Sequence, residues 1–188
     1  MEKGGVVANY IPQLEAFGDH HWGVSLSTID GQRLNLGFSD TPFTIQGVSL
    51  VLTYAICLNE LGPERVHHYQ GREPSGRSFN ALALDHQKKP HNPLVNAGGL
   101  VSVALILSEV RPDLGSDLAA KYDFIFETIK KMAGNCYLHF NNSAYLAERR
   151  NSDRNFALAH FLAENKCLPP GVDVKKVLDL YCQVRTIF

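Results

Sequence analysis

The chain lacks most of the features that would place a protein in a membrane or on a nucleic acid. The apolar run Leu100–Leu107 is too short for a membrane span and contains Ser102. Met1–Ala8 has neither the hydrophobic core of a signal peptide nor the Arg/Ser character of a transit peptide. The formal net charge is only -1, which is too balanced for a broad nucleic-acid-binding surface. We therefore expect no membrane and no nucleic-acid partner.

Clustered metal ligands are also missing. The four cysteines show no C-x-x-C spacing, which predicts reduced, structural thiols in a reducing compartment. The adjacent pairs His20-His21 and His67-His68 lack the i, i+4 spacing of helical metal sites. The sequence therefore predicts no metal site.

What the chain has is the composition of one globular domain. It holds 188 residues, of which 45% are hydrophobic and 20% charged, enough to bury a substantial core. Alternating apolar residues on both sides of Asp30-Gly31 predict a β-hairpin from Trp22 to Phe38. Gly62–Pro93 is rich in Gly, Pro and polar residues and is predicted to be a loop region, with at most a short element at Asn80–Leu84.

Helical patterns dominate the rest of the chain. The predicted helices span Gln46–Leu61, Leu100–Val110, Lys121–Met132, Asp153–Glu164 and a last helix capped by Asp173 that runs through Val184. A strand pair followed by helices indicates the α+β class, with helices beside an antiparallel sheet. Because a lone hairpin is marginal in water, we expect the sheet to need strands that this chain does not contain.

Several polar residues suit a small polar ligand. Asn96 lies next to the small residues Ala97, Gly98 and Gly99, and Glu148 and Asn155 are seven residues apart, so that one helical face could present both. A carboxylate, two amides and two tyrosine hydroxyls, from Tyr10 and Tyr181, fit an α-amino acid. The alternative is structural: loop-ordering amides, a capping carboxylate and core tyrosines with satisfied hydroxyls.

The order of several motifs then resembles one family. Seven motifs follow one another as in the glutaminases of the β-lactamase-like serine hydrolase superfamily: NYIPQLEAF, WGVSLSTIDGQR, EPSG-x-x-FN, KPHNPLVNAG, KMAGN, SDRNFA and KC-x-PPGVD. The segment PHNPLVNAG is more similar to the animal, kidney-type enzymes than to the bacterial ones. The resemblance covers almost the whole chain. It implies a β-lactamase/transpeptidase-like fold and hydrolysis of L-glutamine to L-glutamate and ammonia through an acyl-serine, without metal or organic cofactor.

The resemblance also assigns site residues and a setting. The family's substrate-binding positions match Tyr10, Gln46, Asn96, Glu148, Asn155 and Tyr181. Glu148 corresponds to the residue that holds the substrate ammonium. The animal enzymes imply a mitochondrial location, with the cytoplasm as the alternative, and a homo-oligomer. Ala83 replaces an aromatic residue in the interface loop that aligns with Asn80–Leu84, so the family's oligomer contacts do not transfer simply.

The departures from the family concern its chemistry. Where the family has a Ser-x-x-Lys pair at the start of a helix, this chain has Gly47 and Leu50. Ser49 is no substitute, because two residues along a helix is a rotation of about 200°, and no lysine occurs between Lys3 and Lys88. The family's domain continues past Phe188 and supplies further strands, an active-site tyrosine and an oxyanion-hole donor. We therefore expect residues 1–188 to be a glutaminase catalytic domain that is incomplete at its C-terminus.

Two hypotheses follow from these matches and departures. The chain is either a glutaminase with lost or strongly impaired activity, or a pseudoenzyme that binds ligand weakly or associates with active glutaminase subunits.

Overall fold

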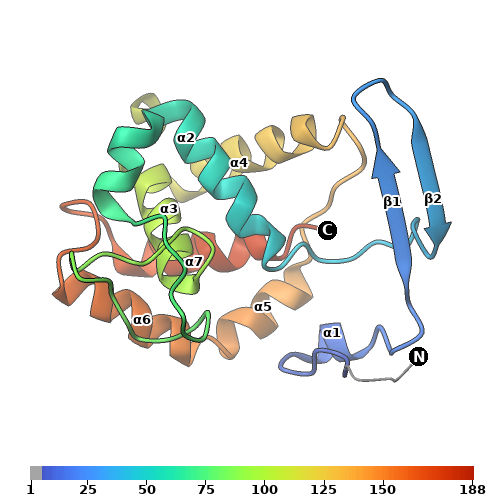
Figure 1. Ribbon diagram of the computed structural model, residues 1–188, viewed down its shortest axis with the longest axis horizontal. Helices are drawn as coiled ribbons and strands as arrows, with labels where there is room; N and C mark the ends of the chain where they lie inside the picture. Colours follow the sequence, from blue (N-terminus) through green and yellow to red (C-terminus); the bar gives the residue numbers. More distant parts are fainter. Residues whose placement is uncertain (1–5) are drawn as a thin grey trace.

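The computed structural model describes residues 6–188. Most of Met1–Ala8, in which we expected no signal or transit peptide, therefore lies outside the described residues. A small hairpin stands beside a cluster of helices (Figure 1). The elements are α1 (Pro12–Glu15), β1 (Gly23–Ser27), β2 (Arg33–Gly37), α2 (Val48–Tyr69), α3 (Asn96–Ser108), η1 (Pro112–Leu114), α4 (Leu118–Met132), α5 (Asn142–Arg150), α6 (Asp153–Glu164) and α7 (Val174–Arg185). Within residues 6–188, no helix is both long and apolar enough to cross a membrane.

Helix α3 is the centre of the core. Every residue from Asn96 to Leu107 is buried, and α2, α4, α6 and α7 all contact this helix (Figure 1). Its sequence, NAGGLVSVALILS, contains no charged residue, as expected of a helix that is covered on all sides. The predicted helix Leu100–Val110 began four residues late and ended two residues late.

Those two glycines serve packing within the protein rather than approach to a ligand. A Cβ on Gly98 would lie 2.7 Å from the Cα of Pro93 and would also collide with the carbonyl of Asn92. A Cβ on Gly99 would collide with the side chain of Leu50 and lie 3.1 Å from the ring of Tyr181. The absence of side chains at both positions allows α3 to pack closely against its neighbours.

We expect Gly98→Ala to destabilise the protein by about 1–3 kcal/mol, because the clashing atoms belong to backbone that cannot rotate away. Gly47→Ser is the matched control, because nothing lies within 4 Å of its Cβ position. Its free energy of unfolding should differ from that of the wild type by no more than about 0.5 kcal/mol. Urea unfolding of both variants measures the difference. Equal stability of the two variants would contradict this account of the α3 packing.

The predicted end of the helix Gln46–Leu61 was also wrong, because α2 runs to Tyr69. Its helical conformation breaks at Gly62, where φ is 75° and ψ is 162°, and then resumes with Pro63 and continues to Tyr69. Gly tolerates the positive φ, and Pro is acceptable in the first turn of the new helical segment. The predicted loop from Gly62 was therefore wrong over its first residues. Asn80–Leu84 contains neither helix nor strand.

The other helices match their patterns well. Helix α6 has the predicted bounds, and Asp173 caps α7 by accepting a hydrogen bond from the amide of Lys175 at 2.8 Å. Helix α4 begins at Leu118, three residues before the predicted Lys121, after the cap Asp117. Helix α5 was not predicted, because its nine residues are largely polar. All four cysteines are free thiols.

The predicted hairpin is present, and it is exposed. Strands β1 and β2 pair antiparallel in the register Val24↔Leu36 and Leu26↔Leu34, and every residue in both strands is exposed. Because side chains alternate across a strand, one face of the hairpin is apolar throughout. We call this face the apolar strip; it consists of Trp22, Val24, Leu26, Leu34, Leu36 and Phe38.

The chain end joins the start of α2 to the segment before α5. The amide of Ile45 donates to the carbonyl of Ile187, and the amide of Gln46 donates to that of Arg185, both at 2.9 Å. On the other side, Phe140 and Ile187 form an antiparallel bridge. These backbone bonds hold the last turn of α7 against Gln46 and so position the candidate site.

Candidate functional site

The candidate site begins at the tight turn before α2. Gln46 has a φ of 42°, a left-handed conformation that is unusual for a residue with a side chain. Gly47 follows as the N-cap of α2 without any side-chain cap. Because the space around its Cβ position is open, a serine would fit at residue 47, and its absence is a matter of sequence rather than of available space.

Position 50 is part of the core. Leu50 is 7% exposed, and its side chain lies against Gly99. The nearby hydroxyls are engaged with the helix backbone: Ser49 donates to the carbonyl of Gln46 at 2.6 Å, and Thr53 donates to that of Ser49 at 2.9 Å. The start of α2 therefore carries neither a free nucleophile nor a base.

Four of the six predicted binding residues meet beside this turn. The hydroxyl of Tyr10 lies 2.8 Å from Oε1 of Gln46 and 2.8 Å from Oε1 of Glu148. Glu148 is buried near the end of α5, and Tyr181 is buried on α7. Burial, followed by the hydrogen bond to Glu148, raises the pKa of Tyr10 to about 12, so its hydroxyl is protonated at neutral pH.

Arg185 joins these four residues, and the sequence analysis did not identify it. Its Nη2 lies 2.9 Å from Oε1 of Gln46 and 3.5 Å from Oε1 of Glu148, and its Nη1 lies 3.3 Å from the hydroxyl of Tyr181. Burial opposes the charge of this guanidinium, but Tyr181, Glu148 and Tyr10 outweigh burial and raise its pKa. The signal was its position one helical turn after Tyr181, which places both side chains on one face of α7.

The remaining two predicted residues form a second group. Nδ2 of Asn96, in the first turn of α3, donates to Oδ1 of Asn155 at 3.0 Å. The amide of Asn96 donates to the carbonyl of Phe79 at 2.9 Å, which ties the long loop to α3. The six predicted residues are thus present as two hydrogen-bonded groups, one around Arg185 and one at the start of α3.

The spacing argument for Glu148 and Asn155 was wrong. They do not share a helical face, because Glu148 is on α5 and Asn155 is on α6. The two helices are separated at Asn151 and Ser152, and the hydroxyl of Ser152 bonds back to the carbonyl of Glu148. The polar sequence around this break contains no Gly or Pro, so no turn signal marked it.

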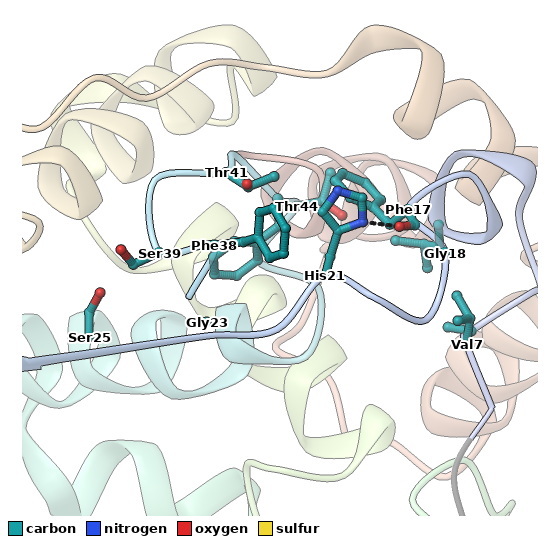
Figure 2. Close-up of a pocket in the computed structure, with 13 residues that line it drawn as sticks. Val7, Phe17, Gly18, His21, Gly23, Ser25, Phe38, Ser39, Thr41 and Thr44 are labelled. Atoms are coloured by element: carbon teal, nitrogen blue, oxygen red, sulfur yellow. Dashed lines mark hydrogen bonds between the residues drawn. The ribbon is translucent and has the colours of Figure 1, made fainter. Parts of the chain in front are cut away.

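An apolar cavity at the base of the hairpin lies outside these two groups, whereas a second depression borders the first group. Figure 2 shows an apolar cavity of about 480 Å³ between the base of the hairpin and α1, where His21 contacts the carbonyl of Phe17. None of the six predicted residues lines it. Tyr10 lines a separate depression of about 620 Å³ between α1 and α5. Among residues 6–188 there is no cluster of three or more His, Cys, Asp or Glu side chains that could hold a metal ion.

Chemically, the arrangement offers hydrogen-bonding groups for a polar ligand without a nucleophile. The architecture, a helical cluster with an antiparallel hairpin, matches solved structures of the β-lactamase-like class. The probable glutaminase ybaS superposes with a TM-score of 0.88 at 29% identity, over 99% of this chain and 58% of that one.

Sequence comparison identifies the family. The glutaminase family model matches residues 5–187. The mitochondrial liver isoforms of glutaminase from rat and mouse are each 43% identical over 184 residues, which is 98% of this chain. The chain therefore belongs to the glutaminase family. It spans 30% of the length of these two relatives.

Proposed function

We propose that this chain is a non-hydrolysing member of the glutaminase family. The family reaction is hydrolysis of the side-chain amide of L-glutamine to L-glutamate and ammonia. In this proposal Tyr10, Gln46, Glu148 and Tyr181 correspond to one part of the family's amino-acid site, and Asn96 and Asn155 correspond to the other. The domain of residues 1–188 is a part of the family's catalytic domain, and it uses no cofactor.

A single observation carries the proposal. Gly47 and Leu50 occupy the positions of the nucleophile and its base, with an open space at residue 47 and a buried leucine at residue 50. Acyl transfer through a covalent intermediate requires a nucleophile that an adjacent base activates. Ser49 does not replace this pair, because its hydroxyl donates to the backbone carbonyl of Gln46 and no lysine lies between Lys3 and Lys88 to act as its base.

The test is ammonia release from L-glutamine by the purified chain, with the rat liver isoform as the positive control. The proposal expects a rate equal to that of a blank without protein. A rate that saturates with glutamine and follows the protein through purification would overturn it.

The apolar strip supports a second part of the proposal, which is self-association. The strip carries no charge, so two copies would meet without repulsion in an interface that uses the same patch on both, as two-fold symmetry requires. Both outer edges of the hairpin also present unpaired backbone groups among the described residues. We propose a second copy of this chain as the occupant of the strip.

This association predicts a concentration-dependent oligomer in light scattering. Leu26 and Leu34 are cross-strand partners, so Leu26→Lys with Leu34→Glu replaces an apolar pair with an opposite-charge pair that the hairpin tolerates. We expect this double variant to be monomeric. The control is Ser25→Lys with Asn35→Glu, the partners on the other face, which should still associate. A monomeric wild-type chain would refute the proposal.

We also propose a mitochondrial location, on the strength of the 43% identity to the mitochondrial liver isoforms. Fractionation of cells that express the natural gene product tests it, and recovery in the cytosolic fraction alone would contradict it.

A further inference from the structure

Arg185 occupies the centre of the group that the proposed function assigns to substrate. Its guanidinium contacts Gln46, Glu148 and Tyr181, three of the residues that the family resemblance assigns to the amino acid. The side chain is 13% exposed and that of Glu148 is 5% exposed. A protein cation therefore already lies on the carboxylate that would hold the substrate ammonium.

A guanidinium and an ammonium compete for the same acceptors. Oε1 of Glu148 lies 2.8 Å from the hydroxyl of Tyr10 and 3.5 Å from Nη2 of Arg185, so an ammonium at this oxygen would share it with the guanidinium. An ammonium at Glu148 would also lie within a few ångströms of the guanidinium. Repulsion between two such charges near a protein surface corresponds to about a thousand-fold in a binding constant.

We propose that Arg185 is a built-in occupant of the ammonium subsite and a specificity-determining residue, which excludes α-amino acids from this site. The inference rests on the proposed assignment of Glu148 to the substrate ammonium. It goes further than the loss of chemistry at Gly47 and Leu50, because it predicts a loss of amino-acid binding with a different cause.

The backbone holds Arg185 in this place. The carbonyl of Arg185 accepts from the amide of Gln46 at 2.9 Å, next to the left-handed turn. The fit of the side chain is nevertheless incomplete. Only one nitrogen faces Glu148, at 3.5 Å, and Nε is buried without a hydrogen-bond partner in the described residues. The guanidinium thus meets the carboxylate through one nitrogen, without the two-nitrogen geometry of the strongest Arg–carboxylate pairs.

The test is isothermal titration of the full chain with two probes. L-Glutamine carries the α-ammonium, and glutaramate has the same carboxylate and amide but lacks it. We expect the wild type to show no preference for L-glutamine over glutaramate. Arg185→Ser should bind L-glutamine at least about a hundred-fold more tightly than the wild type does, and should prefer it to glutaramate.

Two controls separate this effect from a general loss of positive charge or of folding. Arg149→Ser removes an arginine from the neighbouring ion pair with Asp179 and should leave glutamine binding as in the wild type. Arg185→Gln removes the charge but keeps a donor for Gln46, so it serves if the serine variant does not unfold cooperatively. It should show the same gain.

The inference is overturned if neither folded Arg185 variant gains glutamine affinity, or if the gain is equal for glutaramate. Ammonia is measured in the same samples. Hydrolysis by the wild type would overturn the proposed function and, because it requires bound glutamine, the exclusion as well. A missing affinity gain without any hydrolysis would overturn the inference alone, so the two failures are distinguishable.

Discussion

The purified chain should turn over L-glutamine about six orders of magnitude more slowly than a glutaminase with an intact Ser-x-x-Lys pair. In serine hydrolases, loss of the nucleophile alone has an effect of this size on kcat, and loss of its partner adds little because the two act as a unit. Gly47 and Leu50 remove both. Steady-state ammonia release, with Gly47→Ala as a matched variant, measures the difference. The two proteins should give the same rate.

The double variant Gly47→Ser with Leu50→Lys should not regain the activity of the intact enzymes. The serine has room, but the lysine would enter a buried position against Gly99. By family resemblance, an oxyanion-hole donor also belongs to a part of the domain beyond Phe188, and stabilisation of the oxyanion is usually the largest catalytic term. Turnover at the level of the rat enzyme would show that residues 1–188 hold a complete site.

Glu148→Ala should be the most destabilising substitution in the candidate site, by about 3–5 kcal/mol in the free energy of unfolding. It leaves the guanidinium of Arg185, whose side chain is 13% exposed, without its only carboxylate contact in the described residues. It also removes an acceptor from Tyr10. Urea unfolding at neutral pH measures the loss.

Asp179→Ala is the control for this measurement. Asp179 pairs with Arg149 at 2.6 Å, but both side chains are more than a quarter exposed. Pairs that water can reach contribute about 0–1 kcal/mol. We therefore expect Glu148→Ala to lower the free energy of unfolding much more than Asp179→Ala does, although the Glu148–Arg185 contact is the longer of the two. Similar losses in both variants would contradict the claim that burial makes the Glu148–Arg185 contact critical.

The periodicity of apolar residues in the sequence correctly predicted some of the helices and the hairpin. Helix α6 and the hairpin were placed correctly because apolar spacing and turn residues agreed. Two of the misplaced helix boundaries lie at glycines. Gly62 makes a kink within α2 instead of ending it, and Gly98 lies inside α3 because a neighbouring segment packs on it. Local propensity does not contain that information.

The candidate site was predicted from motif resemblance rather than from spacing. Tyr10 and Glu148 are far apart in sequence yet in hydrogen-bond contact, and only the fold brings them together. Arg185 was missed for a physical reason: a basic residue in the last turn of a helix is the ordinary complement to the helix dipole. Its inward direction follows from the backbone bond between Arg185 and Gln46, which no local pattern indicates.

The central claim is that this site cannot hydrolyse the side-chain amide of L-glutamine, because positions 47 and 50 hold no nucleophile and no base. A single-turnover experiment tests it most directly. The chain, in excess, is incubated with L-glutamine labelled with ¹⁵N at the amide, and the label is followed by NMR. We predict that all label remains in the amide, at the level of a protein-free sample. Release of labelled ammonium that depends on the protein would contradict the account.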